Sequence, residues 1–211
     1  MTSDNADMRG LVLTGQGRSF CAGARLEDVE GSDWTDNPLT EVCDGLERLS
    51  VPTICALNGG VYGGGVELAL ACDFRIGVTG MRMFAPPAEL GIHYPWQGLV
   101  RCERLLGLQA TRRIFLLAER VDADQLLDLG FLDRVVEGAA LDAEVSDLCH
   151  RITALAPMAV NGMKQTLQDL GSPGFDADKV RDRIAACFAS DDHAEALLAR
   201  SQKRPPVFRG R

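Results

Sequence analysis

Short apolar runs in the first half of the chain alternate with segments of helical spacing. Residues 11–14 and 53–57 form β-prone runs, and residues 73–78 form a third. Between the first two, apolar residues recur every three or four positions after Asn37-Pro38, which is typical of a helix N-cap followed by proline in the first turn. Strand, helix and strand at this spacing predict an α/β layer with mostly parallel pairing.

The region that follows the second predicted strand is rich in glycine, and the second half of the chain is helical. Residues 58–65 are expected to form a turn that leads into a helix over 66–72. Gly107 and Gly130 stand where helix C-caps are expected, and residues 131–136 predict a short strand. Apolar residues at helical intervals predict seven further helices, over 99–106, 110–118, 122–129, 141–155, 159–170, 178–189 and 194–200. The proline-rich tail at 203–209 is not expected to be helical. We therefore expect a core over residues 1–136 and a helical region over 137–211.

Composition and charge narrow the class of protein. The 22 Lys and Arg against 30 Asp and Glu give a net charge of −8, which opposes binding to nucleic acid. No apolar run approaches the ~20 residues of a membrane span, and residues 1–10 carry no apolar signal segment. Seven cysteines without a Cys-x-x-Cys pair favour buried thiols over disulfides or a zinc site. We expect a cytoplasmic protein without a metal.

The strongest local signal is the segment from Asn58 to Glu67, which contains three consecutive glycines at a strand-to-helix turn. Glycines let the backbone approach a ligand closely, and the amides of a first helical turn lack partners within the helix. Such a turn suits a negatively charged oxygen, and Glu67 could face the same pocket. The alternative is a tight turn whose glutamate only stabilises the helix dipole, and the glycines alone favour that alternative.

A second loop of small residues changes this balance. Residues 20–24, Phe-Cys-Ala-Gly-Ala, follow the first predicted strand. Two such loops after neighbouring strands could each offer one N–H group to a single oxygen, and each donor is typically worth ~3 kcal/mol in a transition state.

These segments together resemble the enoyl-CoA hydratase/isomerase (crotonase) superfamily. Residues 13–24 look like the first oxyanion loop of that family, and residues 51–76 look like its central signature. Residues 118–136 and the tail at 203–208 match further family segments, so the resemblance runs through nearly the whole chain from Leu11. It implies a β-β-α superhelix with a C-terminal helical trimerisation region, and hence a homotrimer or hexamer.

The resemblance also implies roles for individual residues. The N–H groups of Ala24 and Gly64 would hold the thioester oxygen of an acyl-CoA as an enolate, with Glu67 as the principal acid and base. Coenzyme A would enter as part of the substrate, without a separate cofactor. The residues expected to bind substrate are Cys21, Ala22, Gly23, Arg25, Leu26, Gly63, Pro87 and Lys203.

The chain departs from the family pattern where hydratases carry a second glutamate. Counting back from Gly91 places Pro87 at that position, counting forward from Phe84 places Ala88 there, and Glu89 is one or two residues away. Tyr94 follows, in a loop that looks like the methylmalonyl-CoA decarboxylase branch. Tyr94 could orient the acyl group or supply a proton. Alternatively it could pack the pocket wall with Trp96.

A third departure lies at the N-terminus, because family members normally have a hairpin and a helix before the first oxyanion loop. Either the start codon is misplaced, or the chain is a shortened member with a partly open site whose core lacks those elements. Enoyl-CoA hydratase-like lyase is the predicted function. The alternatives are a methylmalonyl-CoA-type decarboxylase, an enoyl-CoA isomerase, and a non-catalytic acyl-CoA-binding subunit.

Overall fold

The computed structural model describes residues 8–25, 37–170 and 174–211, which group into two compact units. One unit spans residues 12–47 and 53–145 and contains both sheets. The other comprises the described residues up to 11, residues 48–52 and residues 146–211, and it is helical.

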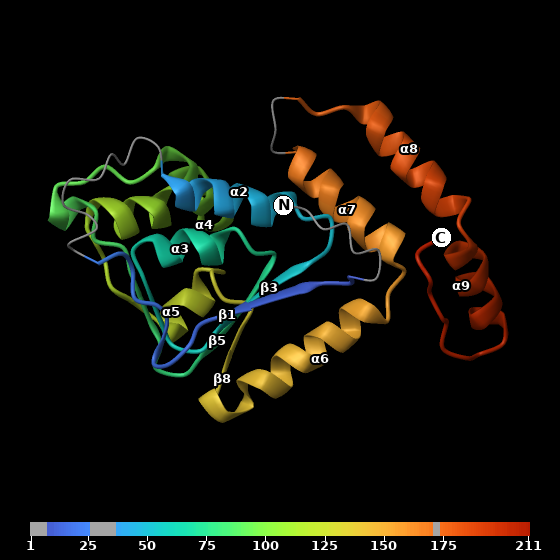
Figure 1. Cartoon of the computed structure of the whole chain (residues 1–211), viewed down its shortest axis with the longest axis horizontal. Helices are drawn as coiled ribbons and strands as arrows, with labels where there is room; N and C mark the ends of the chain where they lie inside the picture. The colour runs from blue at the N-terminus through green and yellow to red at the C-terminus, as the bar shows by residue number, and fades with distance from the viewer. Residues whose placement is uncertain (1–7, 26–36, 171–173) are drawn as a thin grey trace. The chain divides into compact units, whose positions relative to one another are not determined.

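Two four-stranded sheets organise the first unit (Figure 1). The first sheet has the strand order β1-β3-β5-β8, with β1 at Leu11–Thr14, β3 at Thr53–Leu57, β5 at Phe74–Val78 and β8 at Arg134–Val136. The second has the order β2-β4-β6-β7, with β2 at Ser19–Cys21, β4 at Gly60–Tyr62, β6 at Arg82–Phe84 and β7 at Val121–Asp122. All resolved pairings are parallel except β6 with β7.

In each successive pair of strands, one strand belongs to the first sheet and the other to the second. The pair β3 and β4 is followed by α3 at Gly64–Leu70, and the pair β5 and β6 is followed by the 3-10 turn Ala88–Leu90 and α4 at Trp96–Leu116. A strand in each sheet followed by a helix is the predicted β-β-α superhelix, so the expected fold class is confirmed. In Figure 1, α3 and α4 lie on the same side of the first sheet as α2, at Pro38–Arg48.

Several local predictions are confirmed where the signals are strong. The strands at 11–14 and 53–57 have the predicted bounds, and Asn37 caps α2 by accepting the Leu39 N–H at 3.0 Å. Asp122 caps α5, Ala123–Asp128, in a reciprocal pair with Gln125. The remaining helices are α6 at Leu141–Thr153, α7 at Pro157–Leu170, α8 at Ala177–Phe188 and α9 at Asp191–Ser201, and all seven cysteines are free.

The second sheet was not predicted, and this omission explains three errors. The expected turn over 58–65 contains β4, the expected loop over 20–24 begins within β2, and α3 starts at Gly64 rather than at residue 66. These strands are two or three residues long, too short for an alternating pattern to emerge. The two helices expected over 99–106 and 110–118, by contrast, are present as two segments of α4, and the predicted cap Gly107 forms the kink between them, with a φ of 79°.

The end of α3 is anchored by a buried arginine on β5. Arg75 is 3% exposed and donates to the carbonyl of Cys72 at 2.6 Å and to that of Ala69 at 3.3 Å, both at the C-terminal end of α3. A third bond, of 2.6 Å, reaches the carbonyl of Phe131. Because helix C-terminal carbonyls have no partner within the helix, Arg75 satisfies them and fixes the position of α3 on the sheet.

We expect Arg75→Met to destabilise the protein by about 3 kcal/mol, because it removes the arginine donor from the buried carbonyls of Cys72 and Phe131, at roughly 1–3 kcal/mol each. Urea unfolding measures the change. Arg82→Met is the matched control, since Arg82 lies on β6, the next strand along the chain, and is exposed. Equal stabilities of the two variants would contradict the anchoring role of Arg75.

Candidate active site

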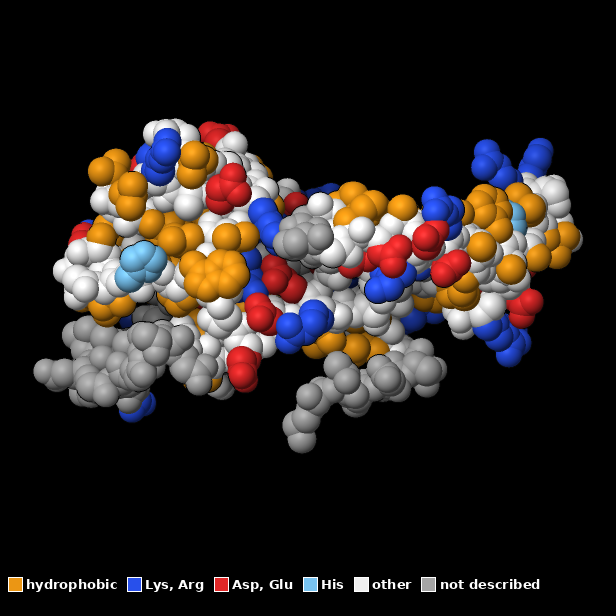
Figure 2. Space-filling model, turned by 90° about the horizontal axis from the view of Figure 1, so that it is seen from above, with side chains coloured by type: hydrophobic (Ala, Val, Ile, Leu, Met, Phe, Trp, Pro, Cys, Tyr) orange, Lys and Arg blue, Asp and Glu red, His pale blue; other side chains and the backbone are white. Residues whose placement is uncertain are grey.

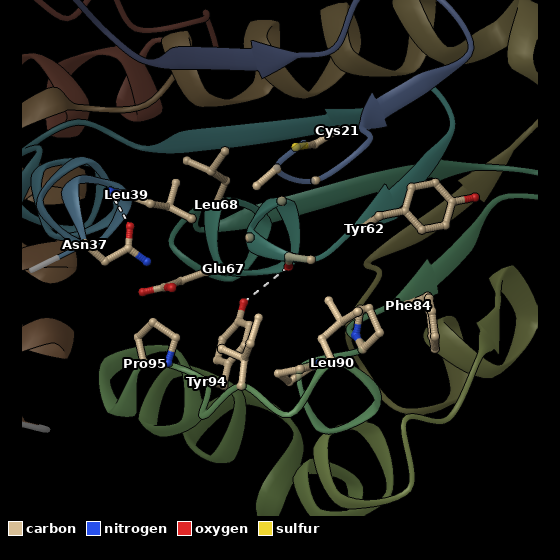
Figure 3. A pocket seen from close by; sticks show the side chains of 18 of the residues that line it. Cys21, Asn37, Leu39, Tyr62, Glu67, Leu68, Phe84, Leu90, Tyr94 and Pro95 are labelled. Atoms are coloured by element: carbon tan, nitrogen blue, oxygen red, sulfur yellow. Dashed lines mark hydrogen bonds between the residues drawn. The ribbon is translucent and has the colours of Figure 1, made fainter. Parts of the chain in front are cut away.

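One cavity of about 880 Å³ lies within the two-sheet unit (Figure 3). Its wall is drawn from four segments, between Cys21 and Ala24, Asn37 and Leu39, Tyr62 and Leu68, and Phe84 and Pro95. Much of the wall is apolar, with leucine, isoleucine, phenylalanine and proline side chains, and Glu67 is among the few carboxylates in it. A mostly apolar cavity with few polar groups is typical of a small-molecule site.

The two glycine-containing loops meet at this cavity. Gly23 and Gly63 both have positive φ, 85° and 54°, which side chains other than glycine rarely adopt. A methyl group built on Gly63 would lie 3.6 Å from the Cα of Gly23, an ordinary van der Waals distance, so the two loops lie side by side. The predicted meeting of the two loops is therefore present in the fold.

Further close contacts hold the second loop in place. A methyl group on Gly65 would lie 2.4 Å from the Cβ of Cys21, and one on Gly64 would lie 2.5 Å from a methyl carbon of Leu39. Packing therefore requires glycine at position 65, whereas at position 64 the contact is with the end of the flexible Leu39 side chain, which can shift. Among the described residues, neither the N–H of Ala24 nor that of Gly64 donates a hydrogen bond, and both residues line the cavity.

Glu67 is completely buried in the cavity wall, one turn into α3. Its Oε1 accepts a hydrogen bond from Nη1 of Arg101 at 2.5 Å, and its Oε2 has no partner among the described residues. Burial raises the pKa of the Glu67 carboxyl, and the Arg101 guanidinium opposes that rise. In Figure 3 the carboxylate points toward the side where Asn37 and Pro95 lie, away from Tyr62 and Phe84.

Tyr94 also lines the cavity, and its hydroxyl donates to the carbonyl of Gly63 at 3.3 Å. That carbonyl belongs to the same peptide unit as the N–H of Gly64. The ring packs on Phe115 with centroids 4.6 Å apart, and burial raises the pKa of Tyr94 above its usual range. A hydroxyl that stays protonated and bonded to the loop is better placed to orient the site than to release a proton. Trp96, by contrast, is exposed and is not part of the wall.

The other predicted site residues divide into three groups. Seven of them line the cavity, namely Cys21, Ala22, Gly23, Ala24, Gly63, Gly64 and Pro87. Arg25 is exposed and is not among the lining residues, and Leu26 lies outside the described residues. Lys203 follows α9 in the helical unit, so its role in substrate binding stays a prediction.

Neither of the positions expected for a second acid carries one. Pro87 is buried in the wall and Ala88 is exposed. Glu89 lies on the exposed 3-10 turn, yet it is among the lining residues. Glu67 is therefore the one buried carboxylate among the described residues of this wall.

Sequence reasoning missed Arg101. The residue lies in a predicted helix, where an arginine is usually an exposed residue, but here it is 6% exposed. A signal was present in its neighbours: Gly98 lies three residues earlier on the same helix face, and a small residue at this spacing lets another element pack closely.

The comparisons with known proteins agree with this architecture. The family model described as enoyl-CoA hydratase/isomerase matches residues 1–211. The chain is 33% identical to the enoyl-CoA isomerase/hydratase fer4 of Mycosarcoma maydis over 96% of this chain and 77% of that protein. It is 30% identical to a crotonyl-CoA hydratase of Syntrophomonas wolfei, over 98% and 82% of the two chains.

Solved structures give the same result for the fold. An enoyl-CoA hydratase from Bacillus anthracis superposes with a TM-score of 0.90 at 27% identity, covering 99% of this chain and 84% of that one. An enoyl-CoA hydratase/carnithine racemase from Magnetospirillum magneticum gives 0.89 at 28% identity, covering 99% and 81%. The chain therefore belongs to the enoyl-CoA hydratase/isomerase family, within the crotonase superfamily, and it is an enzyme of the hydratase-like class.

Two features are absent from residues 8–25, 37–170 and 174–211. No helix in this part of the chain is long and apolar enough to cross a membrane. Over the same residues, no group of three or more His, Cys, Asp or Glu side chains is arranged to hold a metal ion.

Gly98, in the first turn of α4, is expected to tolerate no side chain. A methyl group there would lie 2.5 Å from a ring carbon of Tyr94 and 3.0 Å from Oε2 of Glu67. Gly98→Ala should therefore destabilise the protein by about 1–3 kcal/mol through overpacking, although alanine is the better helix former. Urea unfolding measures this change.

Gly45→Ala provides the matched control. Gly45 lies inside α2 and has no described atom within 4 Å of an added methyl group, so alanine should stabilise the helix by up to ~1 kcal/mol. The same sign of change at both positions would contradict the tight packing between Gly98, Tyr94 and Glu67.

Proposed function

We propose that this chain adds water to an unsaturated acyl-CoA thioester, with Glu67 as the single acid and base. The observation that carries the proposal is the convergence, in one cavity, of two backbone loops with unpaired N–H groups and one buried carboxylate. The N–H groups of Ala24 and Gly64 are the donors for the thioester oxygen. Donors aimed at a developing oxyanion are usually the largest single contribution to such a reaction.

The steps follow from this assignment. Glu67 removes a proton from a water molecule as the water oxygen bonds to C3, and the electron pair of the double bond moves to give an enolate. The two N–H groups hold the enolate oxygen. Glu67 then returns the proton to C2, which yields the 3-hydroxyacyl thioester. One carboxylate can serve both steps because it gains a proton in the first and loses it in the second.

Coenzyme A takes part only as the thioester carrier, and the proton transfers need no other cofactor. We keep the predicted absence of nucleic acid from the partners on the grounds of the net charge of −8. The cytoplasm is the proposed compartment, since seven free thiols suit reducing conditions.

Decarboxylation of a malonyl-type thioester is the second candidate. The observation that favours it is the buried proline at position 87, which leaves only one buried carboxylate in the described wall. Loss of CO2 generates an enolate directly, so the reaction needs the paired N–H donors and a single later protonation.

Side-by-side assays with crotonyl-CoA and methylmalonyl-CoA distinguish these candidates. We expect loss of the crotonyl double bond with the wild-type protein, and a decrease in kcat of roughly 10²–10⁴-fold with Glu67→Gln at nearly unchanged affinity for the thioester. Glu103→Gln, at an exposed position on α4, is the control and should retain wild-type activity.

Other results would point elsewhere. Release of CO2 from methylmalonyl-CoA without hydration would establish the decarboxylase, and a shift of the double bond would establish the isomerase. A loss of activity with Glu89→Gln as large as that with Glu67→Gln would show that hydration uses two carboxylates. Thioester binding without any turnover would indicate a binding subunit.

We also propose that the helical unit joins copies of this chain into a trimer or a hexamer. Large apolar side chains are exposed on its helices, including Met163, Leu167, Ile184, Phe188, Leu197 and Leu198, each at least 49% exposed. Figure 2 shows hydrophobic side chains over these helices at the right of the view. Monomers rarely expose so much apolar surface, and a second copy supplies a matching surface.

Sedimentation equilibrium tests the proposed assembly. We expect a mass three or six times that of one chain, and a smaller species for Leu167→Glu/Phe188→Glu, because charges on a buried interface are unpaired. Arg151→Glu, at an exposed position on α6, is the control. A monomeric wild-type protein at micromolar concentration would overturn the proposal.

A further inference from the structure

Arg101 connects the carboxylate in the cavity wall to helix α2. Its Nη1 donates to Oε1 of Glu67 at 2.5 Å, while its Nη2 donates to Oε2 of Glu47 at 2.9 Å and to Oδ1 of Asp44. The arginine side chain is 5% exposed and that of Glu67 1%, whereas Asp44 and Glu47 are more than one-third exposed. Asp44 and Glu47 thus hold the guanidinium on its solvent side, and on the side of the cavity it pairs with the buried Glu67.

This arrangement makes the two oxygens of Glu67 unequal. Oε1 is occupied by the guanidinium, and Oε2 is buried without a partner among the described residues. A buried carboxylate oxygen without a donor is costly, and in native structures such an atom requires an explanation. A water molecule or a substrate proton at Oε2 would satisfy it.

The planar guanidinium also limits how the carboxylate can turn. Its two terminal nitrogens bond to opposite partners, so a rotation that kept the bond to Glu67 would break those to Asp44 and Glu47. A lysine ammonium is a point charge, and it would not impose the same orientation.

We propose that Arg101 is a positioning residue that fixes Glu67 through Oε1 and leaves Oε2 as the one atom that exchanges a proton with the substrate. This inference rests on the proposed hydratase function and adds the residue that determines the geometry and charge of its base. Arg101 is not among the cavity-lining residues, so it acts through Glu67 rather than on the substrate.

Among the charged and titratable groups around Glu67, Arg101 is the one that favours the ionised carboxylate. From α2, Asp44 and Glu47 raise the pKa of Glu67, and burial raises it most. Cys43, also on α2, is neutral because burial raises the pKa of its thiol to about 12, and Tyr94 is neutral for the same reason. Among these groups only Arg101 lowers the pKa of Glu67.

The direction in which pH changes activity follows from these contributions to the pKa of Glu67. Glu67 must be ionised to accept a proton, so activity falls on the acid side as its carboxyl becomes protonated. Removing Arg101 raises the pKa of Glu67 further. The acidic limb of the pH profile of kcat/KM, where activity falls as Glu67 is protonated, must then move to higher pH. Removing the negative charges of Asp44 and Glu47 must move it the other way.

The test compares Arg101→Met, Arg101→Lys and the control Arg112→Met, an exposed position on the same helix. For Arg101→Met we expect kcat for crotonyl-CoA to fall at least ~10-fold, KM to change by less than about threefold, and the acidic limb to move to higher pH. Arg101→Lys should keep the limb near its wild-type position yet lower kcat. The control should match the wild-type protein in all three.

Two additions keep the test decisive. Should Arg101→Met fail to fold, Asp44→Asn/Glu47→Gln must move the acidic limb to lower pH. An acidic limb that stays in place or moves to higher pH in that double variant overturns the proposal. The proposal is also overturned if folded Arg101→Met keeps both the kcat and the acidic limb of the wild-type protein.

A carbon-13 NMR titration of the Glu67 carboxyl, assigned with Glu67→Gln, separates this inference from the proposed function. If the wild-type protein is inert with thioesters, the function is wrong. A titration that still moves to higher pH in Arg101→Met would then show that Arg101 controls the charge of Glu67. A titration that does not move refutes the role of Arg101 even in an active enzyme.

Discussion

The close approach of two backbone segments is the constraint on which the site depends. The loop after β2 and the turn between β4 and α3 lie side by side at Gly23 and Gly63, and Gly65 lies against Cys21. A side chain at Gly65 would force the segments apart, because its Cβ would lie 2.4 Å from that of Cys21, whereas Gly23 and Gly63 are favoured by their positive φ. The parallel pairing of β2 with β4 delivers both segments to the same edge, so the short second sheet serves mainly to bring them together.

Charge is arranged around that contact in layers. The cavity wall holds one buried carboxylate, a buried guanidinium lies behind it, and two half-exposed acids on α2 lie beyond. A buried ion pair contributes little net stability because both partners lose their hydration. Its presence here is better explained by chemistry, since an oriented and ionised carboxylate in an apolar cavity is what acid–base catalysis requires.

Sequence alone predicted the elements that carry long or well-capped signals. The five-residue buried strand at Thr53–Leu57 and the Asn37-Pro38 start of α2 were identified from local pattern, and the family resemblance supplied the superhelix. The second sheet was missed because its strands are too short to show a period. Arg101 was missed because the burial of an arginine is decided by the packing of α4 on α2 and α3, and not by neighbours in sequence.

The residues that received a role from the resemblance do not all lie at the cavity, and the difference depends on what determines the position of each one. Glycines and small residues of the two loops all lie at the cavity, since their positions follow from the backbone path. Arg25 is exposed and away from the lining, as is common for a long charged side chain whose placement no packing constraint determines.

The peptide between Gly63 and Gly64 illustrates how the fold prepares for turnover. Its carbonyl receives both the Val66 N–H at 3.1 Å and the Tyr94 hydroxyl at 3.3 Å, so the peptide plane cannot swing about its axis. The orientational freedom of the opposite N–H is therefore lost when the chain folds. Under the proposed function, a substrate oxygen would meet an N–H dipole that is already aimed, and the reorganisation that slows the same reaction in water would be largely absent.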